Sequence, residues 1–228
     1  MPPEAAPATL PPEAAPAIRS AATIILTRSG PKGPEVLMGM RGAAAVFMPS
    51  KYVFPGGAVD SGDALVALAR PLPPRCAARV GGGAQAIAAA AIRELWEETG
   101  LALGLPGAWT APAGWESFAA RGLAPSAEAL RFVFRAITPP GRPRRFDARF
   151  FLADAAHIAG DPEDFSAASD ELSHLHWIAL SEARWLDLPF ITEVVLAEVS
   201  ALLRDGPGEA GVPFFDNSGN TPIFRRLT

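Results

Sequence analysis

The chain has 228 residues, a mass of 23.8 kDa and 49% hydrophobic residues, which is enough to bury one sizeable core. Its net charge of −4 argues against a general nucleic-acid or membrane surface, because both partners favour a basic excess. The single cysteine, Cys76, excludes an internal disulfide and fits a reducing compartment, so we expect a cytoplasmic protein. No apolar run is long enough to span a bilayer.

The N-terminal segment is rich in alanine and proline. Prolines interrupt any apolar stretch that a secretory signal would need, so 1–19 are predicted to be a disordered tail and 20–228 a single domain. Alternating and β-branched apolar residues then predict two strands, over 21–28 and 35–41, joined by a Gly/Pro turn as a hairpin.

A short strand over 52–54 is predicted to enter a glycine loop, Pro55-Gly56-Gly57. Glycine permits backbone angles and close approaches that other residues resist. A helix is predicted over 84–99, because Ile87, Ala88, Ala91, Ile92 and Leu95 form an apolar stripe and Gly100 stands in the usual stop position.

Three carboxylates, Glu94, Glu97 and Glu98, border that stripe at positions i, i+3 and i+4 and so share one helix face. Like charges packed together repel, and a hard divalent cation would compensate them. The cluster therefore predicts a metal site, although paired glutamates alone are also common on solvated helix faces.

The remaining pattern alternates strands with a second long helix. Strands are predicted over 130–138 and 147–153, around a turn at 139–142, and over 172–179. Apolar residues between 190 and 203 suit a helix packed on a sheet. Strands mixed with two long helices predict an α/β sandwich.

The segment Arg93-Glu94-Leu95-Trp96-Glu97-Glu98-Thr99-Gly100-Leu101 resembles the second half of the Nudix box, whose pattern is Gly, five residues, Glu, seven residues, then Arg-Glu-hydrophobic-x-Glu-Glu-x-Gly-hydrophobic. The first half departs from it. Gln85 stands where the box expects Glu, but Asp63 follows Gly57 at the family spacing. Positions nine apart lie on roughly opposite faces of a helix, so Gln85 could not join Glu94.

We therefore expect the additional carboxylate to come from the loop, as Asp63 or Asp60, and 64–83 to be an insertion within the box. An insertion with prolines and glycines could be a lid, a dimer contact or a flexible loop.

The resemblance, which covers roughly 21–203, implies the Nudix fold, an α/β/α sandwich with a mixed β-sheet. It implies that Glu94, Glu97 and Glu98 hold Mg²⁺ or Mn²⁺. It further implies that Arg93 orients the glutamates and that Gly56 and Gly57 set the loop against the substrate. Family members differ in the general base. The candidates for the base in this chain are Glu97, Glu98 and the more distant Glu171.

The split box resembles the branch of Nudix hydrolases that includes a peroxisomal coenzyme A diphosphatase, as do Ile137-Thr138-Pro139 and the stretch from Arg145 to Phe151. This implies hydrolysis of coenzyme A or acyl-coenzyme A to 3′,5′-ADP and a phosphopantetheine product. Hydrolysis of ADP-ribose, dinucleotides or nucleoside triphosphates is the alternative within the family. A catalytically silent nucleotide-binding module, which Gln85 favours, is the alternative of another class.

Basic residues near this stretch could contact a phosphate remote from the scissile bond, or could be a solvated hairpin. Arg145 and Arg149 are the predicted substrate ligands among them, beside Arg142 and Arg144. The peroxisomal address is not carried over, because the sequence ends in Arg226-Leu227-Thr228. We expect a small-molecule partner, and a homodimer is conceivable.

Two further features are predicted to be structural. His174 and His176 point to the same side of a strand, which would permit a metal pair, but no cysteine or third histidine is near in sequence. Cys76 has no nearby histidine that would favour a catalytic thiol.

Overall fold

The structure is a computed structural model that describes residues 16–43, 45, 48–206 and 211–228. Its strands are β1 (Ile18–Gly30), β2 (Gly33–Arg41), β3 (Tyr52–Val53), β4 (Gly56–Ala58), β5 (Gly104–Pro106), β6 (Leu123–Pro125), β7 (Arg131–Ile137), β8 (Arg145–Asp154), β9 (Leu172–Ala179), β10 (Val212–Asp216) and β11 (Ile223–Leu227). Its helices are α1 (Pro74–Val80), α2 (Ala84–Thr99), α3 (Glu116–Ala119), α4 (Leu180–Ala183) and α5 (Phe190–Asp205), with short 3₁₀ turns η1 (Ser61–Leu65) and η2 (Ala155–His157).

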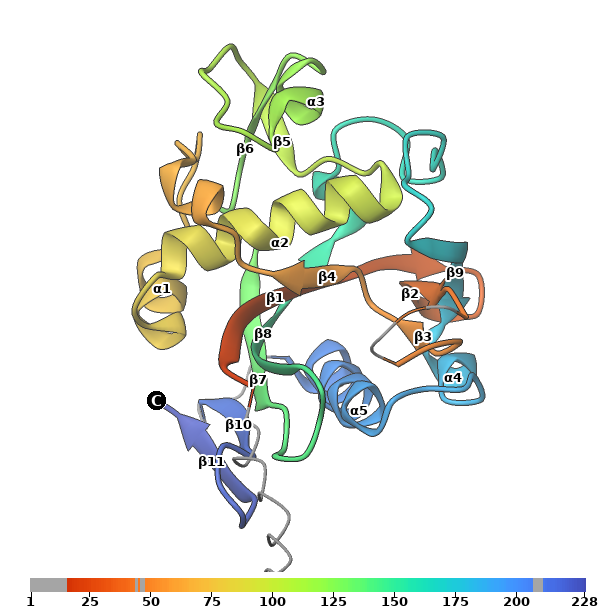
Figure 1. Ribbon diagram of the computed structural model, residues 1–228. Coiled ribbons are helices and arrows are strands. Elements are labelled where there is room, and N and C mark those ends of the chain that lie inside the picture. Colours follow the sequence, from red (N-terminus) through yellow and green to blue (C-terminus); the bar gives the residue numbers. More distant parts are fainter. Residues whose placement is uncertain (1–15, 44, 46–47, 207–210) are drawn as a thin grey trace, which may run out of the picture.

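One mixed sheet of nine strands organises the described part of the chain. Its order is β11-β10-β7-β8-β1-β2-β3, while β4 pairs with β1 and β9 with β2. The long strand β1 runs parallel to β8 and antiparallel to β2 and β4, and β10 runs parallel to β7. A separate two-stranded sheet, β5-β6, lies with α3 beyond α2 (Figure 1).

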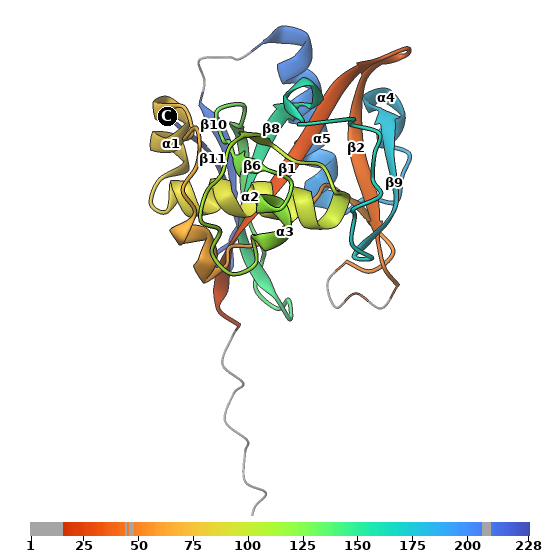
Figure 2. The same cartoon turned by 90° about the horizontal axis from the view of Figure 1, so that it is seen from above.

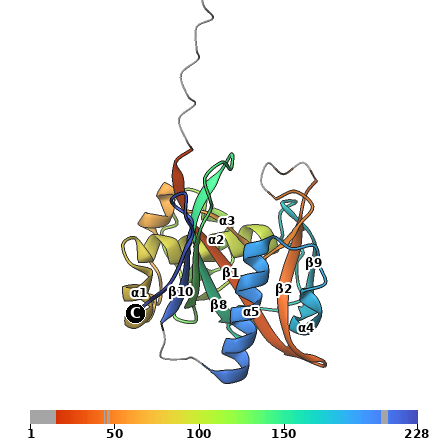
Figure 3. The same cartoon turned by 90° about the horizontal axis from the view of Figure 1, so that it is seen from below.

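Helices cover both faces of the sheet, with α2 on one side and α5 on the other (Figures 1 and 3). Figure 2 looks down on α2, which lies across the strands. The core has a separate cluster on each side: Ile87, Ile92 and Leu95 of α2 pack in one, and Val195 and Val199 of α5 pack in the other. The predicted fold class, an α/β sandwich with a mixed sheet, is confirmed.

The local predictions are close to the observed elements. The helix over 84–99 has the predicted bounds and ends at Gly100, whose φ of 73° suits glycine and whose N–H donates to the carbonyl of Trp96 over 2.8 Å. The helix predicted over 190–203 continues to Asp205. β1 begins at Ile18, so residues 18 and 19 belong to a strand and not to the predicted tail. The tail's residues 1–15 lie outside the described residues.

The segment 64–83, predicted to be an insertion, contributes to the core. Val66, Leu72 and Val80 are buried there beside α2. The helix α1 lies within this segment and contacts β7, because the amide of Phe132 donates to the sulfur of Cys76. This segment is therefore part of the packed domain, which argues against its being a flexible loop. None of the helices in the described residues is long and apolar enough to cross a membrane.

Candidate active site

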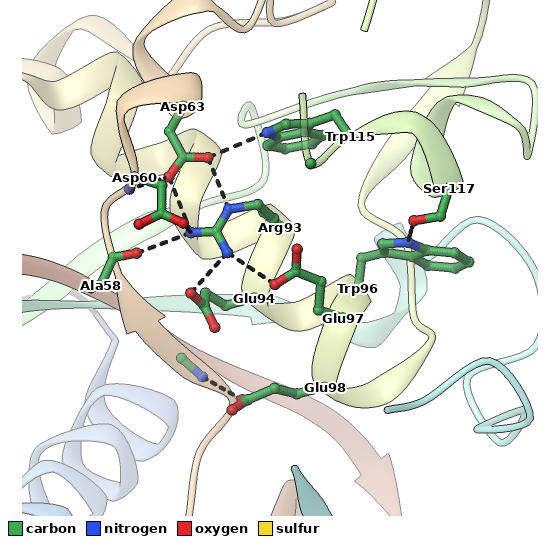
Figure 4. Close-up of polar contacts among 12 residues, drawn as sticks. Ala58, Asp60, Asp63, Arg93, Glu94, Trp96, Glu97, Glu98, Trp115 and Ser117 are labelled. Atoms are coloured by element: carbon green, nitrogen blue, oxygen red, sulfur yellow. Dashed lines mark hydrogen bonds and ion pairs between the residues drawn. The ribbon is translucent and has the colours of Figure 1, made fainter. Parts of the chain in front are cut away.

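The end of α2 carries the acidic cluster. Glu94, Glu97 and Glu98 come from its last two turns, on the side that faces β4 and β1 (Figure 4). Their exposure differs: the side chains of Glu94 and Glu97 are 12% and 40% exposed, and Glu98 is 2% exposed. The buried helix stripe fixes this face, because the apolar side chains of the same turns are locked into the core.

Arg93 is the hub of the cluster. Its Nη1 donates to Glu94 and to Glu97, both over 2.9 Å, and its Nη2 donates over 2.9 Å to the carbonyl of Ala58 on β4. On its other side Nε and Nη2 meet the two oxygens of Asp63 at 3.0 and 3.1 Å. A planar guanidinium suits such paired contacts, so one buried arginine fixes the glycine loop, the 3₁₀ turn and two glutamates together.

Asp63 holds this arginine in place. It is 1% exposed, and besides Arg93 it accepts from the amide of Asp60 at 2.8 Å and from the indole of Trp115 at 3.3 Å. Asp60 is 63% exposed, and its nearest approach to Arg93 is 3.9 Å. The loop carboxylate at the family spacing is thus Asp63, and its oxygens are directed to Arg93 and not to the face that carries Glu98.

Gln85 lies away from the cluster, as its helical position predicts. Its side-chain amide donates over 2.8 Å to the carbonyl of Val66, in the segment before α1. It therefore anchors the chain that precedes the helix and leaves the acidic face unaltered.

Both glycines of the loop are closely packed, Gly56 against backbone and Gly57 against a side chain. A side chain at Gly56 would meet backbone atoms of Ala22 and Thr23, and one at Gly57 would collide with the carboxylate of Glu94. The amide of Gly56 also donates to Glu98 over 2.8 Å. The Pro-Gly-Gly loop, whose glycines form β4, therefore lies directly against the acidic face.

Burial and mutual repulsion perturb these carboxyls. Burial, partly offset by Arg93, raises the pKa of Glu94 to about 7. Burial, reinforced by the charge of Glu94, raises the pKa of Glu98 to about 8. Burial also raises the pKa of Glu97. The site therefore disfavours full ionisation of its carboxyls, and the charge of Glu171, in the loop before β9, raises the pKa values of Glu94 and Glu98 further.

The acidic face opens into a cleft of about 1170 Å³ on the α5 side of the sheet. Glu94, Glu97, Glu98 and Glu171 line one part of it. Its basic lining residues are Arg19, Arg41, Lys51, Arg93, Arg142 and Arg144. Its aromatic lining residues are Phe54, Phe146, Phe150, Phe190 and Phe215. A cleft of this size can hold a nucleotide conjugate and not merely a mononucleotide.

The sequence-based assignment of Arg145 and Arg149 as substrate ligands is corrected by the structure, because neither residue lines this cleft. Along β8, Phe146 and Phe150 face the cleft, so the alternation of a strand turns these two arginines to the opposite face. Both are buried there. Arg145 donates to three backbone carbonyls, and Arg149 pairs with Asp147 at 2.9 Å.

The other predicted structural residues stay outside the acidic face. The Nδ1 of His176 lies 2.7 Å from the carbonyl oxygen of His174, to which it can only donate, and the ring packs edge-on against Tyr52. Burial raises the pKa of the Cys76 thiol, which packs against β7.

The donor chemistry fits a divalent cation. Carboxylate oxygens are the ligands that Mg²⁺ and Mn²⁺ prefer, and uncompensated charge surrounds them here. In the described residues, no three acidic, histidine or cysteine side chains are already gathered around a common point. Glu94 and Glu97 instead turn to Arg93, and Glu98 turns to Gly56. Cation binding would therefore have to redirect these side chains.

Comparison with known proteins places this site in a family. No protein-family profile matches the sequence. This chain is similar to a NUDIX hydrolase from Alicyclobacillus acidocaldarius whose crystal structure is known. The two sequences are 30% identical and the two structures have a TM-score of 0.61, over 80% of this chain and 90% of that one. This chain belongs to the Nudix hydrolase superfamily.

One curated relative agrees with the Nudix assignment, and one further solved structure shares the fold. A Caenorhabditis elegans protein named as a nudix hydrolase is 30% identical over 178 residues, which are 72% of this chain and 52% of the relative. This chain thus spans about half the length of that curated relative. The structure of a C. elegans Ap4A hydrolase, 17% identical with a TM-score of 0.50 over 82% of this chain and 99% of that one, shares the fold.

Sequence reasoning missed several residues that line the Nudix cleft. Arg19, Arg41 and Lys51 come from strands or loops with no motif of their own. Phe190 and Phe215 come from the N-terminus of α5 and from β10. The one signal in the sequence was the apolar start of the helix predicted over 190–203. It indicated that this helix packs on a sheet and gave no indication of a cleft.

Proposed function

We propose that this Nudix protein is a divalent-cation-dependent diphosphatase that hydrolyses the phosphoanhydride of a nucleoside diphosphate linked to another group. The observation that carries the proposal is the acidic face of α2, held by Arg93 and open to the cleft. Carboxyls with raised pKa values that line a large cavity are typical of catalytic sites.

In this proposal Glu94, Glu97 and Glu98 hold Mg²⁺ or Mn²⁺. When bound, such a cation neutralises diphosphate oxygens and lowers the pKa of a coordinated water. Arg93 is a positioning residue, because its guanidinium donates its hydrogen bonds to Asp63, the glutamates and Ala58. Gly56 and Gly57 bring the loop backbone against the carboxylates and leave room for the substrate beside them.

The proton of the attacking water needs a base, for which Glu97, Glu98 and Glu171 are the candidates. Glu97 and Glu171 are the accessible ones, since both line the cleft with exposed or half-exposed side chains. Glu98 also lines the cleft but is buried against Gly56, so it is the least accessible of the three candidates.

Coenzyme A or an acyl derivative is the proposed substrate, giving 3′,5′-ADP and a phosphopantetheine product. The support is the split box and the two arginines, Arg142 and Arg144, that line the cleft on the β7–β8 hairpin. These could meet the 3′-phosphate, a role that buried Arg145 and Arg149 cannot take. A cytoplasmic location is proposed because the single cysteine suits a reducing compartment.

A substrate panel tests the proposal. Coenzyme A, an acyl-coenzyme A, ADP-ribose, NADH and nucleoside triphosphates are incubated with Mg²⁺ or Mn²⁺, and products are identified by mass. The expected result is 3′,5′-ADP from coenzyme A, lost in Glu97→Gln and with chelator and retained in Glu128→Gln, an exposed carboxylate outside the cleft. Turnover of another panel member would replace coenzyme A as substrate. Binding without turnover of any member would show a silent module.

A further inference from the structure

An aromatic strip runs out of the cleft onto the protein surface. Phe190 at the start of α5 and Phe215 on β10 both line the cleft and lie in edge contact, with ring centroids 6.3 Å apart. Phe224 on β11 lies 6.3 Å beyond Phe215 and also contacts Phe134. The strip is defined by Phe190, Phe215 and Phe224.

The strip is poorly covered for its size. Phe190 is 67% exposed and Phe224 is 57% exposed, and the neighbouring Ile223 is 53% exposed. Scattered apolar residues on a surface need no explanation, but a contiguous aromatic patch that continues a binding cleft marks a site for an apolar ligand or partner. In the described part of the chain Phe215 is partly buried against the core, whereas Phe190 and Phe224 on either side of it are largely exposed.

The floor of the adjoining cleft is apolar as well. Ala136, Ala148 and Phe150 line it where β7 and β8 face α5, with Ile191 opposite. The same cleft also carries the acidic groups of α2 and basic groups from other elements. The cleft thus combines charged groups suited to a diphosphate with apolar side chains that lead towards the surface.

The geometry points to a substrate in which the nucleoside diphosphate carries an apolar chain, and we propose that the aromatic strip binds that chain. This inference rests on the proposed function and specifies its substrate class. A chain fits better than a second base, because the rings meet at interplanar angles of 61° and 50°, so the strip has no parallel pair of rings to enclose a flat base. The open end would accommodate chains of different length.

Binding of the chain remote from the scissile bond acts equally on the ground state and the transition state. It should therefore lower KM and leave kcat nearly constant. Each methylene that leaves water contributes to affinity, so kcat/KM should rise by about 10-fold or more from acetyl- to dodecanoyl-coenzyme A, even with the chain only partly covered.

The test measures kcat and KM for coenzyme A and for its acetyl, hexanoyl and dodecanoyl esters, below the concentrations at which the esters form micelles. The variants are Phe190→Ser and Phe224→Ser, because both side chains are largely exposed and removing them leaves the core intact. Trp185→Ser is the matched control: it removes an aromatic side chain that is 80% exposed but lies outside the cleft lining.

We expect KM to fall with chain length in the wild type and in the Trp185 variant, and this dependence to flatten in both phenylalanine variants. Equal kcat/KM for all four substrates in the wild type would overturn the inference while leaving the diphosphatase intact. The inference would also be overturned if the wild type were an oligomer that dissociates in the phenylalanine variants while the dependence of KM on acyl-chain length stayed unaltered. A second copy of the chain would then be what covers the strip. No turnover of any of the four would instead remove coenzyme A and its esters as substrates, and the substrate panel above would then decide whether the diphosphatase activity itself remains.

Discussion

Glu98→Gln should stabilise the cation-free protein, and the gain should grow with pH. The Glu98 carboxyl is 2% exposed and its pKa is raised from 4.5 to about 8, chiefly by burial. A group whose folded pKa is raised favours the folded state below its unfolded pKa, and this stabilisation is lost as pH rises to the folded pKa. Glutamine keeps an oxygen that can accept from the amide of Gly56 but has no charge to bury.

The magnitude follows from the two pKa values of Glu98. Between about pH 5.5 and pH 8 the unfolded carboxyl is ionised while the folded one keeps its proton, which destabilises the wild type by about 1.4 kcal/mol per pH unit. Over that interval the loss is about 3 kcal/mol, and the variant lacks it. For a domain of this size, that corresponds to a rise of about 6–12 °C in melting temperature relative to the wild type.

The assay is thermal and urea unfolding of wild type, Glu98→Gln and Glu128→Gln in chelator, at about pH 5.5 and pH 8.5. The advantage of Glu98→Gln over the wild type should increase between the two pH values, and Glu128→Gln should follow the wild type. Adding Mg²⁺ at the higher pH should stabilise the wild type more than Glu98→Gln. A pH-independent difference between wild type and Glu98→Gln would refute the claim that burial raises the pKa of the Glu98 carboxyl in the cation-free site.

Three other outcomes are expected. Arg93→Lys cannot reproduce the paired contacts to Asp63, so its free energy of unfolding should fall by at least about 2 kcal/mol and its kcat by at least about 100-fold. Urea titration and product release measure the two effects, and near wild-type values would contradict the hub role. Gly57→Ala should lower activity with little change in circular dichroism, because its methyl group displaces the Glu94 carboxylate; full activity would count against that packing. Cys76 should react slowly with a thiol reagent at about pH 8 and quickly in urea, since burial raises its pKa; rapid native labelling would oppose this.

The sequence predicted the elements that local periodicity determines. The helix over 84–99 and its end at Gly100 follow from apolar spacing and from a glycine in the left-handed region. The short helix α1 was not predicted, because 64–83 was interpreted only as an insertion with prolines and glycines. Proline at the first helical position lacks only a hydrogen bond that is unmade there anyway, so it can begin a helix.

The parts of the site that depend on long-range pairing could not be predicted in the same way. Arg145 and Arg149 share a strand with Phe146 and Phe150, and alternation separates the two pairs. Which pair faces the cleft is decided by the parallel pairing of β8 with β1 and by α5, both distant in sequence. Likewise, the spacing from Gly57 identified Asp63, but its role depends on a contact with Arg93 thirty residues away.

Hydrolysis in ¹⁸O-labelled water tests the central claim most directly. Wild-type protein, coenzyme A and Mg²⁺ are incubated in labelled water, beside Glu97→Gln, and the products are weighed by mass spectrometry. If water attacks phosphorus and the phosphoanhydride is cleaved, one product should carry one ¹⁸O in its terminal phosphate. The other product and the recovered substrate should carry none, and the variant should give no product. Bound but intact coenzyme A in the wild type, with the other nucleotides of the substrate panel equally unreacted, would contradict the account.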